Sequence, residues 1–443
     1  MKILHYALGF PPYRTGGLTK YCIDLMLTQK EQGNEVALLW PGEMHLVLKK
    51  TKIKERNHWN GIRNFELVDP LPVSLDEGIL EIEAYTKRVN ESVYLNFLRM
   101  YMPDAIHVHT LMGLHKEFLD AAKQLKIKTV FTTHDYFGIC PKVTLYHDGY
   151  VCDDDHDCLD CVKCNQTALG LKKIEILQSP IYRRLKNTKA VKMLRNRHRQ
   201  KYFEASENKQ AENENCVRTA EEYRKLREYY ISMLSMIDYI HFNSSIAEMI
   251  YNRYFHPQNS AVISITHRDI KDHRQERKIK NNILRIAYLG PTKPFKGFQY
   301  LIKMLDDMWN RGIRNFELHL YSESIEEKPY IIHKQNGYQY KQLRSIFDVT
   351  DLLVVPSQWY ETFGYTVLEA LSYGVPVQVT DKVGAKDLVQ YIDPAFICVN
   401  KELNLDKIKL EEFSSEVCRR NIIKTETLHE KEMEKVYRGL GPI

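Results

Sequence analysis

The segment from Asp351 to Val379 constrains the fold most, because it has the pattern of a complete strand–loop–helix–strand unit. The apolar run at 351–355 is typical of a buried parallel strand, which Pro356 ends. Gly364 opens a predicted helix, Gly374 ends it, and residues 375–379 form the next predicted strand. Parallel strands joined by a helix are the building unit of α/β proteins, so we expect a doubly wound α/β fold.

Two glutamates lie at the end of this unit where a ligand would bind. Glu361 is in the loop, and Glu369 is about one turn into the predicted helix. The N–H groups at a helix start favour anions, so the pair suits a ligand with phosphate and hydroxyl groups, such as a nucleotide sugar. On spacing alone, two solvated carboxylates on an ordinary crossover unit are the favoured explanation of the pattern.

The residues between the glutamates favour the ligand-binding interpretation. Residues 361–377 read ETFGYTVLEALSYGVPV, which resembles the signature of retaining glycosyltransferases of family four. The resemblance implies the GT-B fold, in which two Rossmann-like doubly wound domains face a cleft. It also implies that Glu361 is catalytic and contacts the transferred sugar, and that Glu369 holds the ribose hydroxyls. The implied diphosphate contacts are the backbone amides of Gly364, Tyr365, Thr366 and Val367.

Length and composition limit the other possibilities. A chain of 443 residues predicts two domains. It contains no run of about 20 apolar residues, and its first residues have the pattern of a strand without a signal peptide. We therefore expect a cytoplasmic protein in which thiols stay reduced. The net charge of +6 is modest and matters only where basic residues cluster.

The first predicted domain covers residues 1–270. A strand at 2–9 leads to Gly16-Gly17 and a helix at about 18–32, which is the layout of a phosphate-side loop. A plain turn would explain the glycine pair alone, but its place matches the donor-binding glycine loop of the resembled family. Residues 41–75 show no clear period and are expected to be irregular or to form short strands, and residues 78–102 look helical.

A histidine ends one strand of this domain. Residues 128–133 predict a strand, and His134-Asp135 follow at its carboxyl end, where ligands of open α/β sheets bind. A structural role for the histidine is equally consistent with its position. The segment resembles a His-Asp subgroup of the family, of the kind that builds bacterial cell-surface polysaccharides. This implies that His134 is catalytic and points at the donor sugar, with Asp135 as an orienting or acceptor-side residue.

A cysteine cluster follows this strand. Five cysteines lie between residues 140 and 164, and in a reducing compartment such spacing indicates metal binding rather than disulfides. The predicted site is a structural zinc, with free thiols or an iron–sulfur cluster as alternatives. The family resemblance implies no catalytic metal. The preferred ligands are Cys152, Cys158, Cys161 and Cys164, with Cys140 as an alternate.

Residues 171–200 are strongly basic. Within them, Ser179-Pro180 is a good helix start, as N-cap and first helical residue. A solvated helix and a helix on an anionic membrane surface are equally consistent with the imperfect apolar stripe. Nucleic-acid binding is not expected, since no recognition motif accompanies the charge. A polar helix is predicted at 204–230, and residues 140–235 form an insertion. The basic residues are Lys172, Lys173, Arg183, Arg184, Lys186, Lys189, Lys192, Arg195, Arg197 and Arg199.

The second predicted domain, 271–425, begins after a charged crossing and carries the nucleotide sugar. Lys296-Gly297 follows its first strand and matches the family lysine that binds the donor diphosphate. Pro291 is a departure, because the family usually has Arg there, and Lys293 is an alternative source of charge. Residues 426–443 are expected to form a C-terminal helix that packs back on the first domain.

The predicted function is a retaining glycosyltransferase, a hexosyltransferase that moves a sugar from a nucleotide-sugar donor to a glycan or lipid-linked acceptor in surface polysaccharide synthesis. A UDP-sugar is expected from family frequency alone. The basic residues 171–200 would hold the enzyme at the inner face of the membrane. Two alternatives remain open at this stage: a non-catalytic GT-B scaffold that binds a partner, which Pro291 favours, and a nucleotide-sugar epimerase of the same fold.

Overall fold

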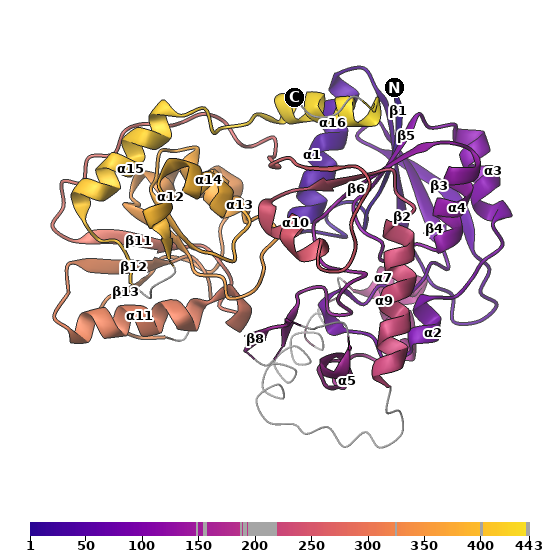
Figure 1. Cartoon of the computed structure of the whole chain (residues 1–443), viewed down its shortest axis with the longest axis horizontal. Helices are drawn as coiled ribbons and strands as arrows, with labels where there is room; N and C mark the ends of the chain where they lie inside the picture. The colour runs from indigo at the N-terminus through magenta and orange to yellow at the C-terminus, as the bar shows by residue number, and fades with distance from the viewer. Residues whose placement is uncertain are drawn as a thin grey trace. The chain divides into compact units, whose positions relative to one another are not determined.

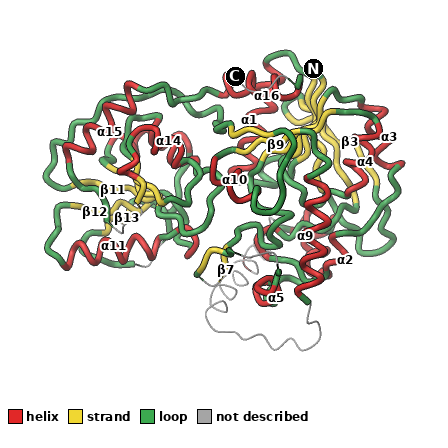
Figure 2. Tube along the Cα trace, viewed as in Figure 1, coloured by secondary structure: helices red, strands yellow, loops and turns green. Residues whose placement is uncertain are grey.

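The computed structural model describes residues 1–147, 149–153, 157–186, 188, 193, 219–323, 326–398 and 402–439. The chain divides into two compact units, each treated separately below. Unit 1 comprises residues 1–143, 153–240 and 254–259, and unit 2 comprises residues 144–152, 241–253 and 260–443. Both units are α/β, as the sequence predicts. Figure 1 labels their elements, and Figure 2 separates helices, strands and loops.

The first sheet has eight strands in the order β10-β9-β6-β5-β1-β2-β4-β3. From β6 to β4 the neighbouring strands are parallel, whereas β3 and β4 pair antiparallel. The chain passes from unit 1 to unit 2 within β9. The strands are β1 (Lys2–Tyr6), β2 (Glu35–Pro41), β3 (Lys52–Trp59), β4 (Ile62–Val68), β5 (Ala105–Val108), β6 (Lys128–Thr132), β9 (Tyr239–Phe242) and β10 (Ser260–Val262).

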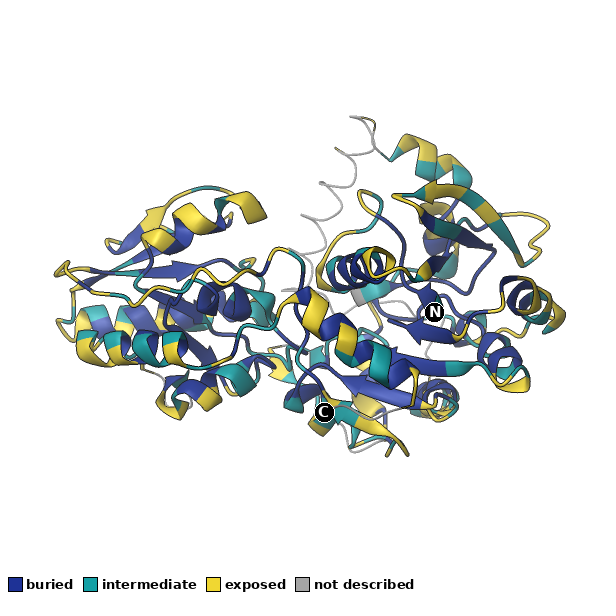
Figure 3. Ribbon diagram, turned by 90° about the horizontal axis from the view of Figure 1, so that it is seen from above, coloured by how far each residue is buried: buried dark blue, intermediate teal, exposed yellow. Residues whose placement is uncertain are grey.

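Helices connect these strands and cover the sheet. Residues of the central strands are almost wholly buried, those of the outer strands β3 and β10 are exposed or half-buried, and the helices carry both buried and exposed positions, as Figure 3 shows by colour. That pattern is expected where helices pack on a parallel sheet. The helices are α1 (Gly17–Glu31), α2 (Ile82–Tyr85), α3 (Ser92–Tyr101), α4 (Lys116–Gln124), α5 (Leu159–Cys164), α6 (Leu171–Leu177), α7 (Pro180–Leu185), α9 (Ala220–Leu234) and α10 (Ser245–Tyr251).

The second sheet has six strands in the order β13-β12-β11-β14-β15-β16, and all its pairs are parallel. The strands are β11 (Leu284–Tyr288), β12 (Phe316–Leu320), β13 (Ile331–His333), β14 (Leu352–Val355), β15 (Val377–Thr380) and β16 (Ile397–Cys398). The helices are α11 (Phe298–Asn310), α12 (Leu343–Asp348), α13 (Tyr365–Leu371), α14 (Lys386–Ile392), α15 (Lys407–Arg419) and α16 (Glu426–Tyr437). A short hairpin, β7 (Tyr146–His147) with β8 (Tyr150–Val151), also belongs to unit 2.

The segment 41–75, expected to be irregular or to form short strands, contains the hairpin of β3 and β4, whose outer strand carries mostly charged and polar residues and therefore lacks an apolar period. One prediction of local structure was wrong. The segment 78–102 is not one helix, because α2 ends at Tyr85 and α3 begins only at Ser92. The predicted polar helix at 204–230 begins, within the described residues, at Ala220 as α9.

Helix α9 packs in unit 1 through polar as well as apolar contacts. The hydroxyl of Tyr223 donates to the carbonyl of Ile79 at 2.8 Å, and that of Tyr230 donates to the carbonyl of Tyr85 at 2.9 Å. Both tyrosines are buried, so each hydroxyl needs such a partner. The last part of the predicted insertion is therefore built into the core of this unit. Among the described residues, none of the helices combines the length and apolar character that crossing a bilayer requires.

One glycine of unit 2 allows two loops to touch. Gly297 has φ +74°, and a Cβ there would lie 1.8 Å from the carbonyl oxygen of Pro356. Only glycine tolerates both the left-handed conformation and this approach. The loop after β11 can therefore lie directly against the loop after β14.

We expect Gly297→Ala to destabilise unit 2 by more than the roughly 1–2 kcal/mol that a left-handed alanine costs, because the Pro356 loop must also move. Gly312→Ala is the matched control, since Gly312 has φ +88° but open space around the added Cβ. Urea titration followed by tryptophan fluorescence measures both. Equal midpoints for the two variants would show that the loop contact is not tight.

Candidate active site

Lys296 and Glu361 form an ion pair at the carboxyl ends of β11 and β14. The ammonium of Lys296 donates to Oε1 of Glu361 at 2.7 Å, and the hydroxyl of Ser357 donates to Oε2 at 2.5 Å. The ammonium also lies 5.0 Å from the ring centroid of Trp359. A phosphate that approached this lysine would meet a charge already held in position.

The backbone of Glu361 is held as firmly as its side chain. Its N–H donates to the carbonyl of Lys382 at 2.9 Å, and its own carbonyl accepts from the N–H of Gly384 at 2.8 Å. A Cβ on Gly384 would lie 2.1 Å from the carbonyl oxygen of Thr362, so this approach also requires glycine. The carboxylate is therefore preorganised by two neighbouring loops, which is the arrangement a catalytic group needs.

Gly364 turns the chain from this loop into helix α13. Its φ of +101° is accessible to glycine, and the helix begins at Tyr365. The N–H of Val367 donates to the carbonyl of Gly364 at 3.1 Å, so this amide is used inside the first turn. Of the four predicted diphosphate contacts, Val367 thus has its N–H occupied within the helix, while Gly364, Tyr365 and Thr366 stay predictions.

Glu369 is a buried carboxylate with an unusual environment. Its side chain is 2% exposed, and Oε1 lies 3.3 Å from Nε2 of His267, which is fully buried. Among the described residues, Oε2 of Glu369 has no hydrogen-bond partner. A buried carboxylate oxygen without a donor costs about 1–3 kcal/mol or more, so it needs an explanation. A ligand hydroxyl would supply the missing donor.

Aromatic side chains surround this carboxylate. The ring of His267 lies 5.1 Å from that of Tyr365 and 5.2 Å from that of Tyr340. Burial and the nearby charge of Glu369 hold the pKa of Tyr338 well above its usual value. Sequence reasoning missed His267 and Tyr338, because they come from separate segments that only the folded unit brings to the two glutamates. It also missed Ser357, which is only four residues before Glu361, because the direction of its hydroxyl depends on the conformation of the loop.

In unit 1, His134 follows β6 and packs against helix α1. Its Nε2 lies 3.3 Å from Nδ1 of His109, and its ring lies 4.8 Å from that of Tyr21. Oδ1 of Asp135 accepts from the N–H of Phe137 at 2.9 Å. Burial raises the pKa of Asp135 to about 6. Because the folded state then binds a proton more tightly than the unfolded state, this group opposes folding progressively as pH rises from about 4 to about 6.

The glycine pair lies at the start of α1, as predicted. Gly16 is the N-cap, has φ +115°, and a Cβ there would meet nothing within 4 Å. Gly17 is the first residue of the helix, which runs for 15 residues. The space beside Gly16 and the helix start are consistent with a phosphate-side loop, and its role in donor binding stays a prediction.

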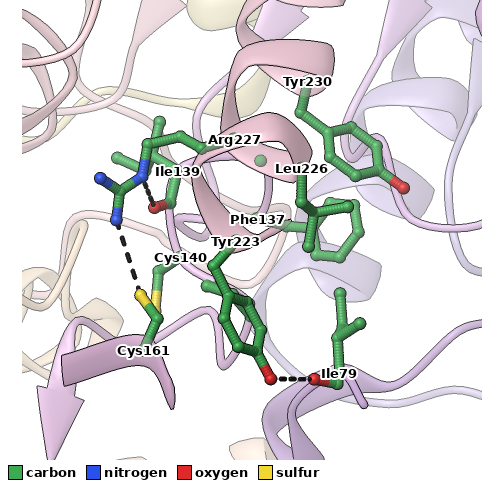
Figure 4. Close-up of a pocket in the computed structure, with 11 residues that line it drawn as sticks. Ile79, Phe137, Ile139, Cys140, Cys161, Tyr223, Leu226, Arg227 and Tyr230 are labelled. Carbon is green, nitrogen blue, oxygen red and sulfur yellow. Dashed lines mark hydrogen bonds between the residues drawn. The ribbon is translucent and has the colours of Figure 1, made fainter. Parts of the chain in front are cut away.

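The cysteines separate into two groups. Cys140, Cys158 and Cys161 are buried in unit 1, where Nη2 of Arg227 lies 3.7 Å from Sγ of Cys161. Arg227 also donates to the carbonyl of Ile139 at 3.0 Å. A small pocket is lined by Arg227, Ile139, Cys140 and Cys161 among others (Figure 4). The pKa of the Cys161 thiol is raised, chiefly by a hydrogen bond with Cys158 and to a smaller extent by burial.

The other two predicted ligands are only half-buried. Cys164 ends helix α5, and Cys152 follows β8 in unit 2, where its N–H donates to the carbonyl of Leu145 at 2.8 Å. Within the described part of the chain, the cysteine sulfurs are not among the groups of three or more ligand atoms that lie within 4.8 Å of one another. A metal would therefore have to draw the thiols closer. Cys140, the alternate ligand, is the cysteine found beside Cys158 and Cys161.

Comparison with known proteins supports a glycosyltransferase. Residues 269–412 match the family model described as glycosyl transferases group 1. The chain is 28% identical over 107 residues to an uncharacterized 41.2 kDa protein in the cps region of Klebsiella pneumoniae. That match covers 23% of this chain and 29% of the Klebsiella protein.

Solved structures show the same fold over almost the whole chain. A trehalose-6-phosphate synthase studied for glycosyl transfer with retention has a TM-score of 0.54 at 8% identity, with 100% of both chains covered. HepE from Anabaena in complex with UDP has a TM-score of 0.52 at 11% identity, covering 99% of this chain and 100% of HepE. The catalytic domain of starch synthase IV from Arabidopsis thaliana has a TM-score of 0.51 at 11% identity, with 99% of both covered.

These likenesses define the class of fold: the chain has the GT-B glycosyltransferase fold. Within it, residues 269–412, which match the glycosyl transferases group 1 model, contain Lys296, Glu361 and Glu369. The fold and this domain match the expectation drawn from the glutamate segment.

The cysteine cluster should hold about one zinc ion per chain, because coordination by thiolates would stabilise the buried cysteines. Elemental analysis of protein purified without added metal tests this. Cys158→Ser and Cys161→Ser should lose the metal, whereas Cys22→Ser, in the core of helix α1, should retain it. Protein that contains neither zinc nor iron would remove the hypothesis.

Proposed function

We propose that this protein is a retaining glycosyltransferase that moves a sugar from a nucleotide-sugar donor to a glycan or lipid-linked acceptor. The observation that carries the proposal is the buried carboxylate of Glu369, whose Oε2 has no hydrogen-bond partner among the described residues. Paired hydroxyls, such as those of a ribose, would donate to both carboxylate oxygens. Such charge-assisted hydrogen bonds are stronger than those between neutral groups.

The neighbouring residues suit the chemistry of the leaving group. A departing nucleoside diphosphate gains negative charge, which Lys296 and the amides that begin α13 would stabilise. The Lys296–Glu361 pair would then open, because the phosphate competes with the carboxylate for the ammonium. Glu361 would then be free to orient the transferred sugar. The family resemblance implies that His134 also points at this sugar. No catalytic metal is needed for these roles.

Similar proteins bear on the donor and the setting. HepE is described in complex with UDP, which supports a UDP-sugar as the donor here, whereas starch synthase IV is described bound to ADP. The Klebsiella relative belongs to a cps region, which supports a role in surface polysaccharide synthesis. Nucleotide sugars are cytoplasmic, so the proposal places the enzyme in the cytoplasm with its acceptor at the inner membrane face.

Glu369→Ala should weaken binding of UDP by roughly 10- to 100-fold, the loss expected for hydrogen bonds to a charged group worth about 1.5–3 kcal/mol. Glu361→Gln should leave UDP affinity within about twofold while lowering turnover, because it acts on the sugar rather than on the nucleotide. Calorimetric titration with UDP, ADP and GDP measures the affinities. Equal UDP affinity in wild type and Glu369→Ala would contradict the assignment.

An exposed apolar surface in unit 1 supports membrane attachment. Val47 and Leu48 are 75% and 92% exposed at the tip of the loop after β2. Hydrogen bonds join this loop to helix α6, from the N–H of Met44 to the carbonyl of Gln178 and from Lys49 to Glu175. We define the apolar surface patch as the exposed residues Leu46, Val47, Leu48, Ile176, Leu177, Ile181 and Leu185.

Basic residues accompany the patch, but fewer than the sequence suggested. Lys172, Lys173 and Arg184 are exposed on α6 and α7. Arg183 is engaged instead: it pairs with the buried carboxylate of Glu66 at 2.6 Å and lies over the ring of Trp40. The predicted basic residues Lys189, Lys192, Arg195, Arg197 and Arg199 lie outside the described residues. Apolar insertion together with charge attraction is the combination that holds a protein on an anionic bilayer.

The protein should sediment with anionic vesicles at low salt and dissociate at high salt, because lipid charge attracts each exposed Lys or Arg by about 1 kcal/mol. Replacing Val47 and Leu48 by Ser should weaken this binding, as should replacing Lys172, Lys173 and Arg184. Met100→Ser, an exposed apolar residue on α3, is the control and should have no effect. Wild-type protein that ignores anionic vesicles at low salt would show that the patch has another use.

A further inference from the structure

Three fully buried histidines lie side by side in unit 1 under helix α1. His5 on β1 is in register with His107 on β5, and His109 follows two residues later on the same side of the sheet. The rings of His5 and His109 are nearly parallel, with an angle of 10° between their planes and centroids 5.3 Å apart. Gln29, also fully buried, faces them from α1. This is a costly use of polar side chains, since each buried nitrogen needs a partner.

Hydrogen bonds link these side chains to His134 in a single line. Oε1 of Gln29 lies 2.8 Å from Nε2 of His5, and Nδ1 of His5 lies 2.9 Å from Nε2 of His109. Nδ1 of His109 then lies 3.3 Å from Nε2 of His134. His107 is a side branch, with its Nε2 2.6 Å from Oγ1 of Thr132. We call the line from Gln29 to His134 the histidine relay.

The acceptor at one end determines the order of protons along the relay. Burial lowers the pKa of His5 to about 4, against the effect of its hydrogen bond with Gln29, so the ring is neutral at pH 7. A neutral imidazole has one N–H and one acceptor nitrogen. A carbonyl oxygen can only accept, so His5 donates from Nε2 to Gln29 and accepts at Nδ1. His109 is fully buried, and as a neutral ring it donates from Nε2 to His5 and accepts at Nδ1, which leaves His134 to donate from Nε2.

A metal site is the competing explanation for the three buried histidines. One nitrogen from each of His5, His107 and His109 lies within 4.8 Å of the others, which is close enough to surround an ion. However, both nitrogens of His5 are already in the relay, and Nε2 of His107 faces a hydroxyl. A metal ligand must present a bare lone pair to the ion, so binding would break these hydrogen bonds. The geometry therefore favours the relay.

We propose that Gln29 is a positioning residue which, through His5 and His109, holds neutral His134 as the tautomer with its proton on Nε2. The consequence is that His134 accepts hydrogen bonds at Nδ1 and, when it takes up a proton, does so at Nδ1. Such orientation of an imidazole by a distant partner is a known way to define which nitrogen meets a substrate. The role of His134 toward the sugar rests on the proposed function, whereas the tautomer itself does not.

Nuclear magnetic resonance of protein labelled with ring-¹⁵N histidine tests the proposal directly. The shifts of the two ring nitrogens distinguish the two neutral tautomers, and the spectrum of His134→Asn identifies the His134 signals. We expect the Nε2–H tautomer for His134 in the wild type at pH 7.5. Gln29→Leu should mix the tautomers, because His5 loses its acceptor, and Gln29→Glu should preserve the wild-type order. Thr28→Val, at a buried neighbouring position of α1, is the matched control and should change nothing.

An Nδ1–H tautomer in the wild type would overturn the proposal, as would a Gln29→Leu spectrum identical to that of the wild type. Stoichiometric zinc that disappears in His5→Asn would establish the metal site instead. If Gln29→Leu does not fold, the wild-type and Gln29→Glu spectra still decide the order of protons. Where sugar transfer is measurable, Gln29→Leu should lower kcat by at least roughly tenfold with little change in donor KM. A relay confirmed by resonance with no transfer activity would refute the proposed function alone.

Discussion

The contact between two loops of unit 2 is the constraint on which its site depends. Gly297 lies so close to the carbonyl of Pro356 that any side chain would separate them, and the N–H of Gln358 donates to the carbonyl of Phe295 at 2.8 Å across the same contact. This approach puts Lys296 within 2.7 Å of Glu361. Parallel strands bring their carboxyl ends to one edge of a sheet, but only the glycine lets the loops beyond that edge meet.

The two glutamates of this site have different surroundings and therefore different expected roles. Glu361 has both carboxylate oxygens paired and its backbone tied to a neighbouring loop, so its position is defined before a ligand arrives. Glu369 is buried beside His267 with one oxygen that lacks a donor within the described residues. A buried carboxylate oxygen without a donor is unfavourable, and under the proposed function the ribose hydroxyls of the donor would supply the missing hydrogen bonds.

Unit 1 shows how an insertion can be partly structural and partly surface. Arg183 and helix α9 are tied to the core by contacts with Glu66, Ile79 and Tyr85, so their polar atoms stabilise the unit. The apolar surface patch on the loop after β2 and on α6 and α7 has no such role. Sequence alone treated residues 171–200 as one basic segment, because charge is visible in a sequence and the partner of each charge is not.

The sequence by itself determined the α/β class, the strand–loop–helix–strand unit around Glu361 and Glu369, and the location of Lys296 and His134 at strand ends. These features follow from local apolar periodicity and from glycine and proline positions, which act over a few residues. The tertiary structure alone decided that Ser357 and His267 support the glutamates, that Cys140 lies with Cys158 and Cys161, and that Gln29 reaches His134 through two buried histidines. The groupings of His267 with Glu369 and of Gln29 with His134 depend on strand order, register and burial, which join residues far apart in the chain. That of Ser357 with Glu361 depends on the conformation of the loop between them.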